Sequence, residues 1–182
     1  MNIIETALEG VLILEPRVFS DERGSFCETF NEETFRKHTG TDFVFVQDNQ
    51  SISKKHVLRG LHFQNPPNAQ GKLVRVVRGA VLDVAVDIRK SSKTYGQHVI
   101  VELSESNNRQ FWVPPGFAHG FLTLEENTIF SYKCTNLYAP DSEGSLLWND
   151  PDLKIDWGIQ DPLVSEKDMV GVEFRNFVSE FD

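Results

Sequence analysis

A stretch rich in basic and imidazole side chains, residues 57–79, contains the residues best suited to chemistry. It reads VLRGLHFQNPPNAQGKLVRVVRG, two strand-like runs joined by a polar loop. Arg59 and His62 lie in the first run and Lys72 opens the second, where a plain strand would carry Val or Thr. These residue types fit a metal site, an anion site, an acid–base site, or only the polar edge of a barrel.

A metal site is the first possibility. The segment PPGFAHG has the Pro-x-Gly-x-x-His spacing of the second cupin motif, with Pro114, Gly116 and His119 at the fixed positions. The first motif of a metal-binding cupin usually supplies His-x-His and a nearby acid. Here Gln64 stands in place of the second histidine and no acid follows at the expected distance. Because glutamine is a poor ligand for transition metals, we expect no metal and no cofactor.

Basic residues in or beside strand-like segments favour an anion site. Arginine suits bidentate recognition of a phosphate, and lysine suits a single contact. For any one of these residues alone, a solvated position on the outer face of a strand is the better explanation. Side chains alternate along a strand, so Lys72 and Arg75 should face opposite sides, and Arg75 is set aside. The basic residues concerned are Arg23, Arg59, Lys72 and Arg75.

An acid–base site would centre on His62, because histidine titrates near neutral pH. A single histidine in an apolar strand is more often a packed residue than a catalyst. Two other residues make the catalytic interpretation stronger: Lys72 in the same hairpin, and Tyr132 near the end of a later strand-like run, TIFSYKCT. A base, a cation and a phenol could together move a proton next to a carbonyl group.

Aromatic residues are frequent, and core packing is the expected role for most of them. Tyr138 differs because it precedes the turn-rich loop APDSEG, where a ring is free to stack on a ligand. The set comprises Phe26, Trp112, Phe117, Phe121, Tyr132, Tyr138 and Trp148.

Size and charge limit the class of protein. A chain of 182 residues with 40% hydrophobic residues fits one domain with one continuous core. The net charge of -9 argues against nucleic acid as a partner, although a local basic pocket for a small anion is compatible with it. Cys27 and Cys134 have no metal-type spacing. No basic leader and no apolar run of about 20 residues is present, so we expect a cytoplasmic protein without membrane contact.

The hydrophobic pattern predicts mostly strands. Short β-rich runs separated by turn signals favour an all-β jelly-roll sandwich or barrel with a few short peripheral helices. One helix is expected over residues 31–40, with Asn31 as N-cap and Gly40 as its stop. The last 35 or so residues, from Trp148, should wrap the barrel, with a short helix near residues 165–169. The expected strands include GVLILEPRVF, ERGSFCETF, FVFVQDN, KLVRVV, AVLDVAVDI, HVIVELS, RQFWVPP, GFLTLEE and TIFSYKCT.

Several long motifs resemble the dTDP-4-dehydrorhamnose 3,5-epimerase family. They are RGLHFQNPPNAQGKLVRVVRGAVLDVAVDIR, WVPPGFAHGF, YKCTNLYAPDSEG and LLWNDPDLKIDW, and the resemblance extends from RGSFCETF to SEKD. It implies a metal-free, cupin-type enzyme formed by a single domain of residues 1–182, usually a homodimer. Its substrate would be dTDP-4-dehydro-6-deoxy-D-glucose, inverted at C3 and C5 in the biosynthesis of dTDP-L-rhamnose.

The resemblance also implies roles for individual residues. His62 would be the base, Lys72 the partner of the enolate oxygen, Tyr132 the acid on the opposite face, and Asp168 the carboxylate that supports His62. Tyr138 would stack on thymine, and Arg23 and Arg59 would contact the diphosphate. The N-terminal segment with Arg23 and Glu28 would reach the partner subunit. The implied substrate-binding positions are Arg23, Phe26, Glu28, Gln47, Asp48, Asn49, Arg59, His119, Tyr138, Glu143 and Lys167.

Three alternatives remain at this stage. A related enzyme on the same scaffold could epimerise only C3 or C5, or isomerise the keto sugar; the presence of Tyr132 favours the full reaction. A non-catalytic nucleotide-sugar binding module would need no base, so His62, Lys72 and Tyr132 together argue against it. A metal-dependent cupin is disfavoured by Gln64.

Overall fold

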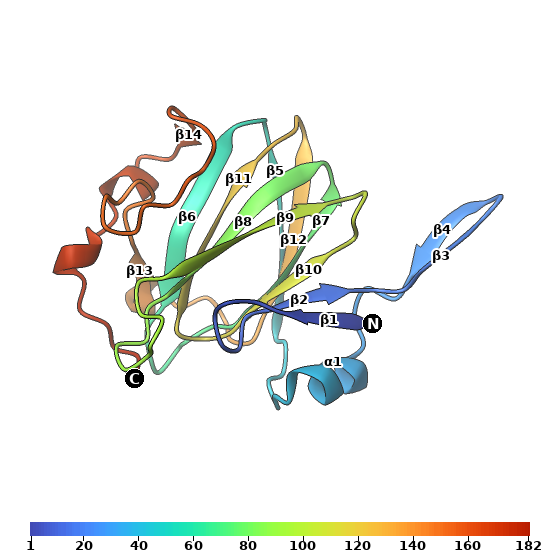
Figure 1. The fold of residues 1–182 in the computed structure, drawn as a ribbon, viewed down its shortest axis with the longest axis horizontal. Coiled ribbons are helices and arrows are strands. Elements are labelled where there is room, and N and C mark those ends of the chain that lie inside the picture. The colour runs from blue at the N-terminus through green and yellow to red at the C-terminus, as the bar shows by residue number, and fades with distance from the viewer.

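Two antiparallel sheets face each other in the computed structural model, which describes residues 1–182 (Figure 1). The first sheet has the order β1 (Asn2–Glu5), β2 (Leu12–Glu15), β10 (Gln110–Val113), β7 (Lys72–Arg78), β12 (Thr128–Cys134) and β5 (Gln47–Ser53). The second has the order β13 (Glu143–Ser145), β6 (Val57–Gln64), β11 (Phe117–Thr123), β8 (Ala80–Asp87) and β9 (His98–Ser104), and β14 (Leu163–Val164) pairs with β6. The predicted all-β sandwich is confirmed.

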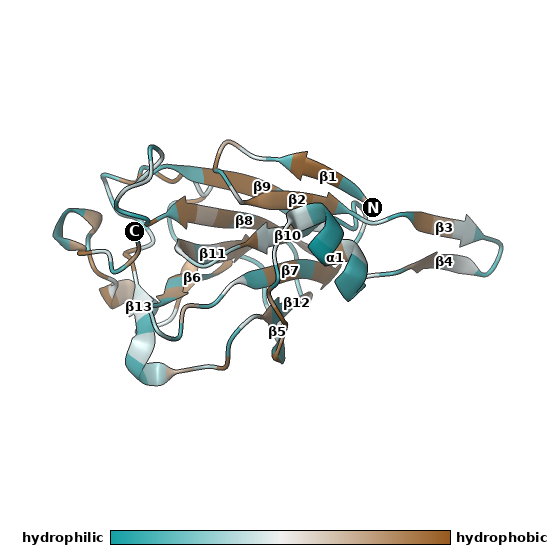
Figure 2. Ribbon diagram, turned by 90° about the horizontal axis from the view of Figure 1, so that it is seen from below, coloured by the Kyte–Doolittle hydropathy of each residue, from teal (hydrophilic) through white to brown (hydrophobic).

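Three apolar layers follow from the alternation of side chains along these strands. The largest lies between the sheets and includes Val74, Val81, Phe111 and Phe130. A second covers the outer face of the second sheet, where the C-terminal segment contributes Leu146, Leu153, Trp157 and Phe181. A third, on the first sheet, joins Leu14, Leu73 and Trp112 to Phe35 of the helix. Figure 2 shows the hydrophobic strands β8, β9 and β11 and the hydrophilic helix beside the first sheet.

The single α-helix, α1 (Glu32–Thr39), has the predicted ends. Asn31 accepts a hydrogen bond from the backbone N–H of Thr34 at 3.0 Å, and Gly40 takes a left-handed conformation with φ 67°. Three short 3-10 helices follow: η1 (Pro140–Ser142), η2 (Asp168–Val170) and η3 (Phe174–Asn176). The helix expected near residues 165–169 is η2. No helix reaches the length and apolar character that a membrane crossing requires.

Two predicted strands differ from the structure. GVLILEPRVF is divided into β2 and β3 (Val18–Asp21), because Pro16 lies between them and cannot donate a ladder hydrogen bond. FVFVQDN becomes a strand only from Gln47 onward, because Phe43 and Phe45 turn aside to pack on Trp112. The strands β1, β13 and β14 were not predicted.

A hairpin stands away from the sandwich. It consists of β3 and β4 (Gly24–Cys27), which pair only with each other, and we call it the arm (Figure 1). Phe26 is 70% exposed and Phe19 51% exposed, so the expectation that Phe26 fills the core is wrong for this chain. A two-stranded hairpin without further packing is at best marginally stable in water.

Candidate active site

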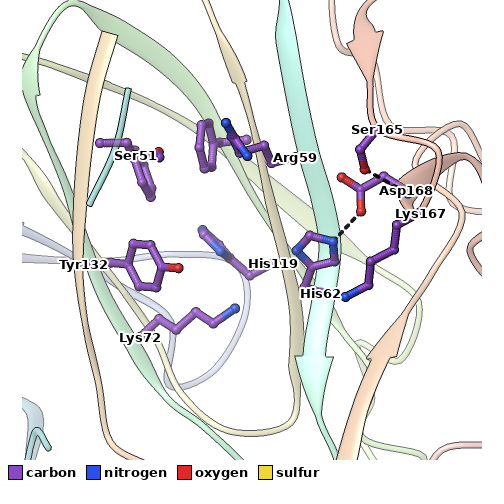
Figure 3. Close-up of a pocket in the computed structure, with 11 residues that line it drawn as sticks. Ser51, Arg59, His62, Lys72, His119, Tyr132, Ser165, Lys167 and Asp168 are labelled. Atoms are coloured by element: carbon purple, nitrogen blue, oxygen red, sulfur yellow. Dashed lines mark hydrogen bonds and ion pairs between the residues drawn. The ribbon is translucent and has the colours of Figure 1, made fainter. Parts of the chain in front are cut away.

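A cavity of about 290 Å³ opens between the two sheets (Figure 3). Strands β5, β7 and β12 of the first sheet form one wall, strands β6 and β11 of the second sheet form the other, and the segment before η2 closes one side. Its lining comprises Ser51, Arg59, His62, Lys72, His119, Phe121, Phe130, Tyr132, Ser165, Lys167 and Asp168. The predicted base, cation, acid and supporting carboxylate therefore converge.

His62 is paired with a buried carboxylate. Its Nε2 lies 2.6 Å from Oδ1 of Asp168, whose side chain is only 5% exposed. Burial by itself raises the pKa of Asp168. Interactions with His62, together with hydrogen bonds from Ser165 and the Gly60 amide, outweigh burial and hold this pKa below its ordinary value. An ionised Asp168 fixes the orientation of the His62 ring and leaves Nδ1 as the ring nitrogen available to a substrate.

A local irregularity brings Arg59 and His62 to the same cavity. Regular alternation would place residues three apart on opposite faces. The pairing of β6 with β11 shifts register between His119 opposite His62 and Phe121 opposite Arg59. At this point Gly60 lies against Gly120: a side chain on Gly60 would come within 2.5 Å of the Gly120 Cα. The close contact of two glycines thus permits the irregularity that turns both side chains inward.

Lys72 and Tyr132 lie on the facing wall, on neighbouring strands. Tyr132 pairs with Val74 and Cys134 pairs with Lys72, so Lys72 and Tyr132 share the inner face of the first sheet. Burial lowers the pKa of Lys72, against the effect of Cys134, Asp83 and Glu143. Burial raises the pKa of Tyr132, so its phenol stays protonated at neutral pH. Arg75, on the opposite face by alternation, does not line the cavity, as the sequence predicted.

A second hollow of about 260 Å³ adjoins the first. The two share His62, Lys72 and Tyr132, so they form one continuous cleft. The lining of the second hollow adds Gln47, Asn49, Phe63, Gln64, Gln70, Tyr138 and Glu143.

A network at the second hollow positions Tyr138. The Tyr138 hydroxyl donates to Glu143 at 3.0 Å, and Lys167 donates to the same oxygen at 2.5 Å. Burial raises the pKa of Glu143, but these two partners outweigh it and keep the pKa below its ordinary value. The Gln47 amide oxygen accepts the backbone N–H of Tyr138 at 3.0 Å. The ring of Tyr138 is 54% exposed, which leaves it free to stack on a flat ligand.

Four predicted substrate-binding residues lie outside the cavity within one chain. Asp48 points to the other face of β5 and pairs with Lys133 at 3.0 Å. Arg23, on the arm, pairs with Asp21, and its side chain is 85% exposed. Phe26 and Glu28 belong to the arm and to the segment that follows it, and neither lines the cleft. Their roles in substrate binding stay predictions.

Gln64 forms hydrogen bonds to the backbone of neighbouring loops. Its amide donates to the backbone oxygens of Asn68 at 2.7 Å and Leu137 at 3.1 Å, and accepts the N–H of Ala139 at 2.9 Å. These bonds hold the loop that carries Tyr138.

Several residues of the site were missed in the sequence, among them Ser51, Ser165 and Asp83. Ser51 and Ser165 line the cavity, and nothing in their local sequence distinguishes them from surface serines. Asp83 lies on β8, next to the cavity-lining strand β11. It is wholly buried and hydrogen-bonded to His119 at 2.7 Å. A signal for Asp83 did exist, since it interrupts the apolar row of AVLDVAVDI on the side that faces the core.

Comparison with known proteins gives the family. The family model described as dTDP-4-dehydrorhamnose 3,5-epimerase matches residues 5–176. The chain belongs to the dTDP-4-dehydrorhamnose 3,5-epimerase family. The enzyme of that name from Salmonella typhimurium is 60% identical over 92% of each chain. The crystal structure of dTDP-6-deoxy-D-glucose-3,5-epimerase from Legionella pneumophila, in complex with dTDP-4-keto-L-rhamnose, superposes with a TM-score of 0.91 at 49% identity, covering 94% of this chain and 91% of that one.

The match to the family model and the 60% identity to the Salmonella enzyme also give the activity. The chain is an isomerase, a dTDP-4-dehydrorhamnose 3,5-epimerase of dTDP-L-rhamnose biosynthesis, and its β-sandwich is of the cupin type. A more distant structure has the same fold: a 3'-monoepimerase from Streptomyces bikiniensis in complex with dTDP-quinovose has a TM-score of 0.90 at 37% identity, covering 94% of this chain and 87% of that one.

Proposed function

We propose that the cavity between the sheets is where dTDP-4-dehydro-6-deoxy-D-glucose is inverted at C3 and C5. A C–H bond beside a ketone is acidic only because the negative charge of the resulting enolate spreads onto oxygen. The reaction therefore needs a base at carbon, a positive charge or donor at the C4 oxygen, and an acid on the other face of the sugar.

His62 is the base in this proposal, and Asp168 stabilises the imidazolium that forms when His62 takes the proton. Lys72 supplies the positive charge at the enolate oxygen. Tyr132 gives its phenolic proton to the same carbon from the opposite side, and both groups then return to their starting states by exchange with solvent. The observation that carries this assignment is that His62 and Tyr132 project into one cavity from opposite sheets, with Lys72 beside Tyr132 (Figure 3).

The second hollow would hold the thymine end of the substrate, and the diphosphate would lie toward the first cavity, which Arg59 lines. Tyr138 would stack on thymine, and Arg59 would bind the diphosphate. Arg59 supports this role because no carboxylate neutralises it; its only side-chain bond is to Ser53 at 3.3 Å. The remaining substrate contacts would come from Gln47, Asn49, His119, Glu143 and Lys167.

A homodimer would complete this site. We infer one epimerase domain of residues 1–182, whose arm packs on a second copy and brings Arg23, Phe26 and Glu28 to the partner's cleft. The exposed Phe19 and Phe26 support the inference, since an isolated hairpin gains little from its own contacts. Cys27 and Cys134 are both free thiols, which suits the reducing cytoplasm that we propose as its location.

Mixing two inactive variants tests the shared site. In a heterodimer of Arg23→Ala and His62→Ala chains, one site would carry both defects and the other would be intact. Random reassembly of an equal mixture should therefore restore about a quarter of wild-type activity if Arg23 serves the partner's site. No recovery after verified subunit exchange would show that each chain uses its own Arg23.

Product analysis distinguishes the full reaction from that of a monoepimerase. The NMR spectrum of the product, after reduction of the ketone, should show inversion at both C3 and C5. A product inverted at one carbon would place this chain with the single-site enzymes.

A further inference from the structure

Asp83 is a charged residue in a position that the fold would fill with an apolar one. It lies on β8 between Val81 and Ala85, both of which belong to the core between the sheets. Its side chain is wholly buried, and Oδ2 has no hydrogen-bond partner. Burying a carboxylate that is only partly hydrogen-bonded is unfavourable. A stability role alone does not account for an aspartate here.

The partners of Asp83 connect it to the cavity. Oδ1 lies 2.7 Å from Nε2 of His119, and His119 lines the cavity. The other charged group facing Asp83 is Lys72, which lines the cavity as well. Burial raises the pKa of Asp83, and His119 and Lys72 oppose that effect. Asp83 is therefore a buried acidic residue behind two groups that line the cavity.

The hydrogen bond decides which atom of His119 meets the substrate. Since Nε2 is occupied by Asp83, Nδ1 is the nitrogen left for a ligand. One proton lies between Nε2 and the carboxylate. A pair with one net negative charge leaves Nδ1 as an acceptor, whereas a pair of zero net charge carries a second proton on Nδ1, whether the shared proton resides on nitrogen or on oxygen. Only in the second arrangement does His119 present an N–H donor to the cavity, which Lys72 also lines.

We propose that Asp83 is a positioning residue for the epimerase reaction: it holds His119 so that Nδ1–H donates to the C4 oxygen of the substrate, together with Lys72. The enolate oxygen then has two partners, a cation and a neutral donor, as in an oxyanion hole. This inference rests on the proposed function, in which Lys72 meets that oxygen.

Asp87 offers a matched control on the same strand. Its side chain is also wholly buried, four residues further along β8, but it is bonded to Arg89, Ser92 and Thr94, away from the cavity. Asp83→Asn should lower kcat by about 10²-fold, the cost of one oxyanion-hole donor, with no loss of thermal stability. Asp87→Asn should do the reverse: lower stability and unchanged kcat. Affinity for dTDP, which lacks the sugar, should be the same in both variants and in the wild type.

A double variant tests whether Asp83 acts through His119. Asp83→Asn should have little further effect on kcat in a His119→Ala background. Unchanged kcat for Asp83→Asn, or the same fold-loss in both backgrounds, would overturn the proposal. If the wild type itself fails to epimerise the keto sugar, the proposed function fails instead.

A spectroscopic measurement on the wild type removes the dependence on a folded variant. Nitrogen-15 NMR of uniformly carbon-13 and nitrogen-15 labelled wild-type protein, with the His119 ring assigned from the backbone assignment, should show a protonated Nδ1 at neutral pH. An unprotonated Nδ1 would contradict the proposal even if every variant failed to fold.

Discussion

His62 and Asp168, which are 106 positions apart in the chain, meet with Nε2 and Oδ1 at a distance of 2.6 Å. The contact joins β6 to the C-terminal segment that covers the second sheet. It depends on the final part of the chain being folded against the sandwich, and so couples the assembly of the site to the packing of that segment.

Replacing Asp168 should damage catalysis more than substrate binding. Asp168→Asn keeps the shape of the side chain but removes the charge that supports the His62 imidazolium. We expect kcat to fall by about 10²–10⁴-fold while affinity for dTDP is retained. Steady-state kinetics and calorimetric dTDP binding check this, and a kcat within a few-fold of wild type would show that His62 needs no carboxylate.

Tyr132→Phe should separate the two halves of the reaction. Without the phenol, His62 can still remove a proton, but the opposite face has no acid. Deuterium exchange in heavy water should therefore persist, while net inversion slows by about 10²–10⁴-fold. NMR measures both on one sample. Equal loss of exchange and inversion, or normal inversion, would remove Tyr132 from the acid role.

Lys72→Met should show that the positive charge at the enolate oxygen comes from this side chain. Removal of the ammonium is expected to lower kcat by about 10²–10³-fold. Dialysis of the wild type against a chelator should leave its activity unchanged. Activity that disappears on chelation and returns with a divalent metal would contradict the assignment of Lys72.

Asp87 should govern part of the acid stability. Burial would raise its pKa, but hydrogen bonds from Arg89, Ser92 and Thr94 lower it from 3.8 to about 2. Since the folded pKa lies below the unfolded one, this stabilisation is complete above about pH 4 and is lost as the pH falls toward 2. Asp87→Asn should cost about 2 kcal/mol in the free energy of unfolding at pH 7. Urea unfolding should show this difference shrinking toward pH 2; a difference independent of pH would refute the linkage.

Local sequence signals predicted the elements that depend on neighbouring residues. Asn31 and Gly40 gave the ends of α1, and strict alternation gave the opposite orientations of Lys72 and Arg75. The same alternation also explains why Asp48, between Gln47 and Asn49, points away from the cleft.

Features that depend on contacts between two distant segments could not be predicted from local sequence patterns. Alternation alone would separate Arg59 from His62; the register shift that unites them needs Gly60 against Gly120 on another strand. The pairing of Asp168 with His62 came only from the family resemblance. Asp83 could not be linked to the site from local patterns, because its partner His119 is 36 residues away on another strand.

Deuterium incorporation by the wild type and by His62→Ala tests whether His62 removes the protons at C3 and C5. When dTDP-4-dehydro-6-deoxy-D-glucose is incubated in heavy water with wild-type protein, it should take up deuterium at both C3 and C5. His62→Ala, folded and able to bind dTDP, should incorporate none at either carbon. Exchange by His62→Ala at the wild-type rate would contradict His62 as the base.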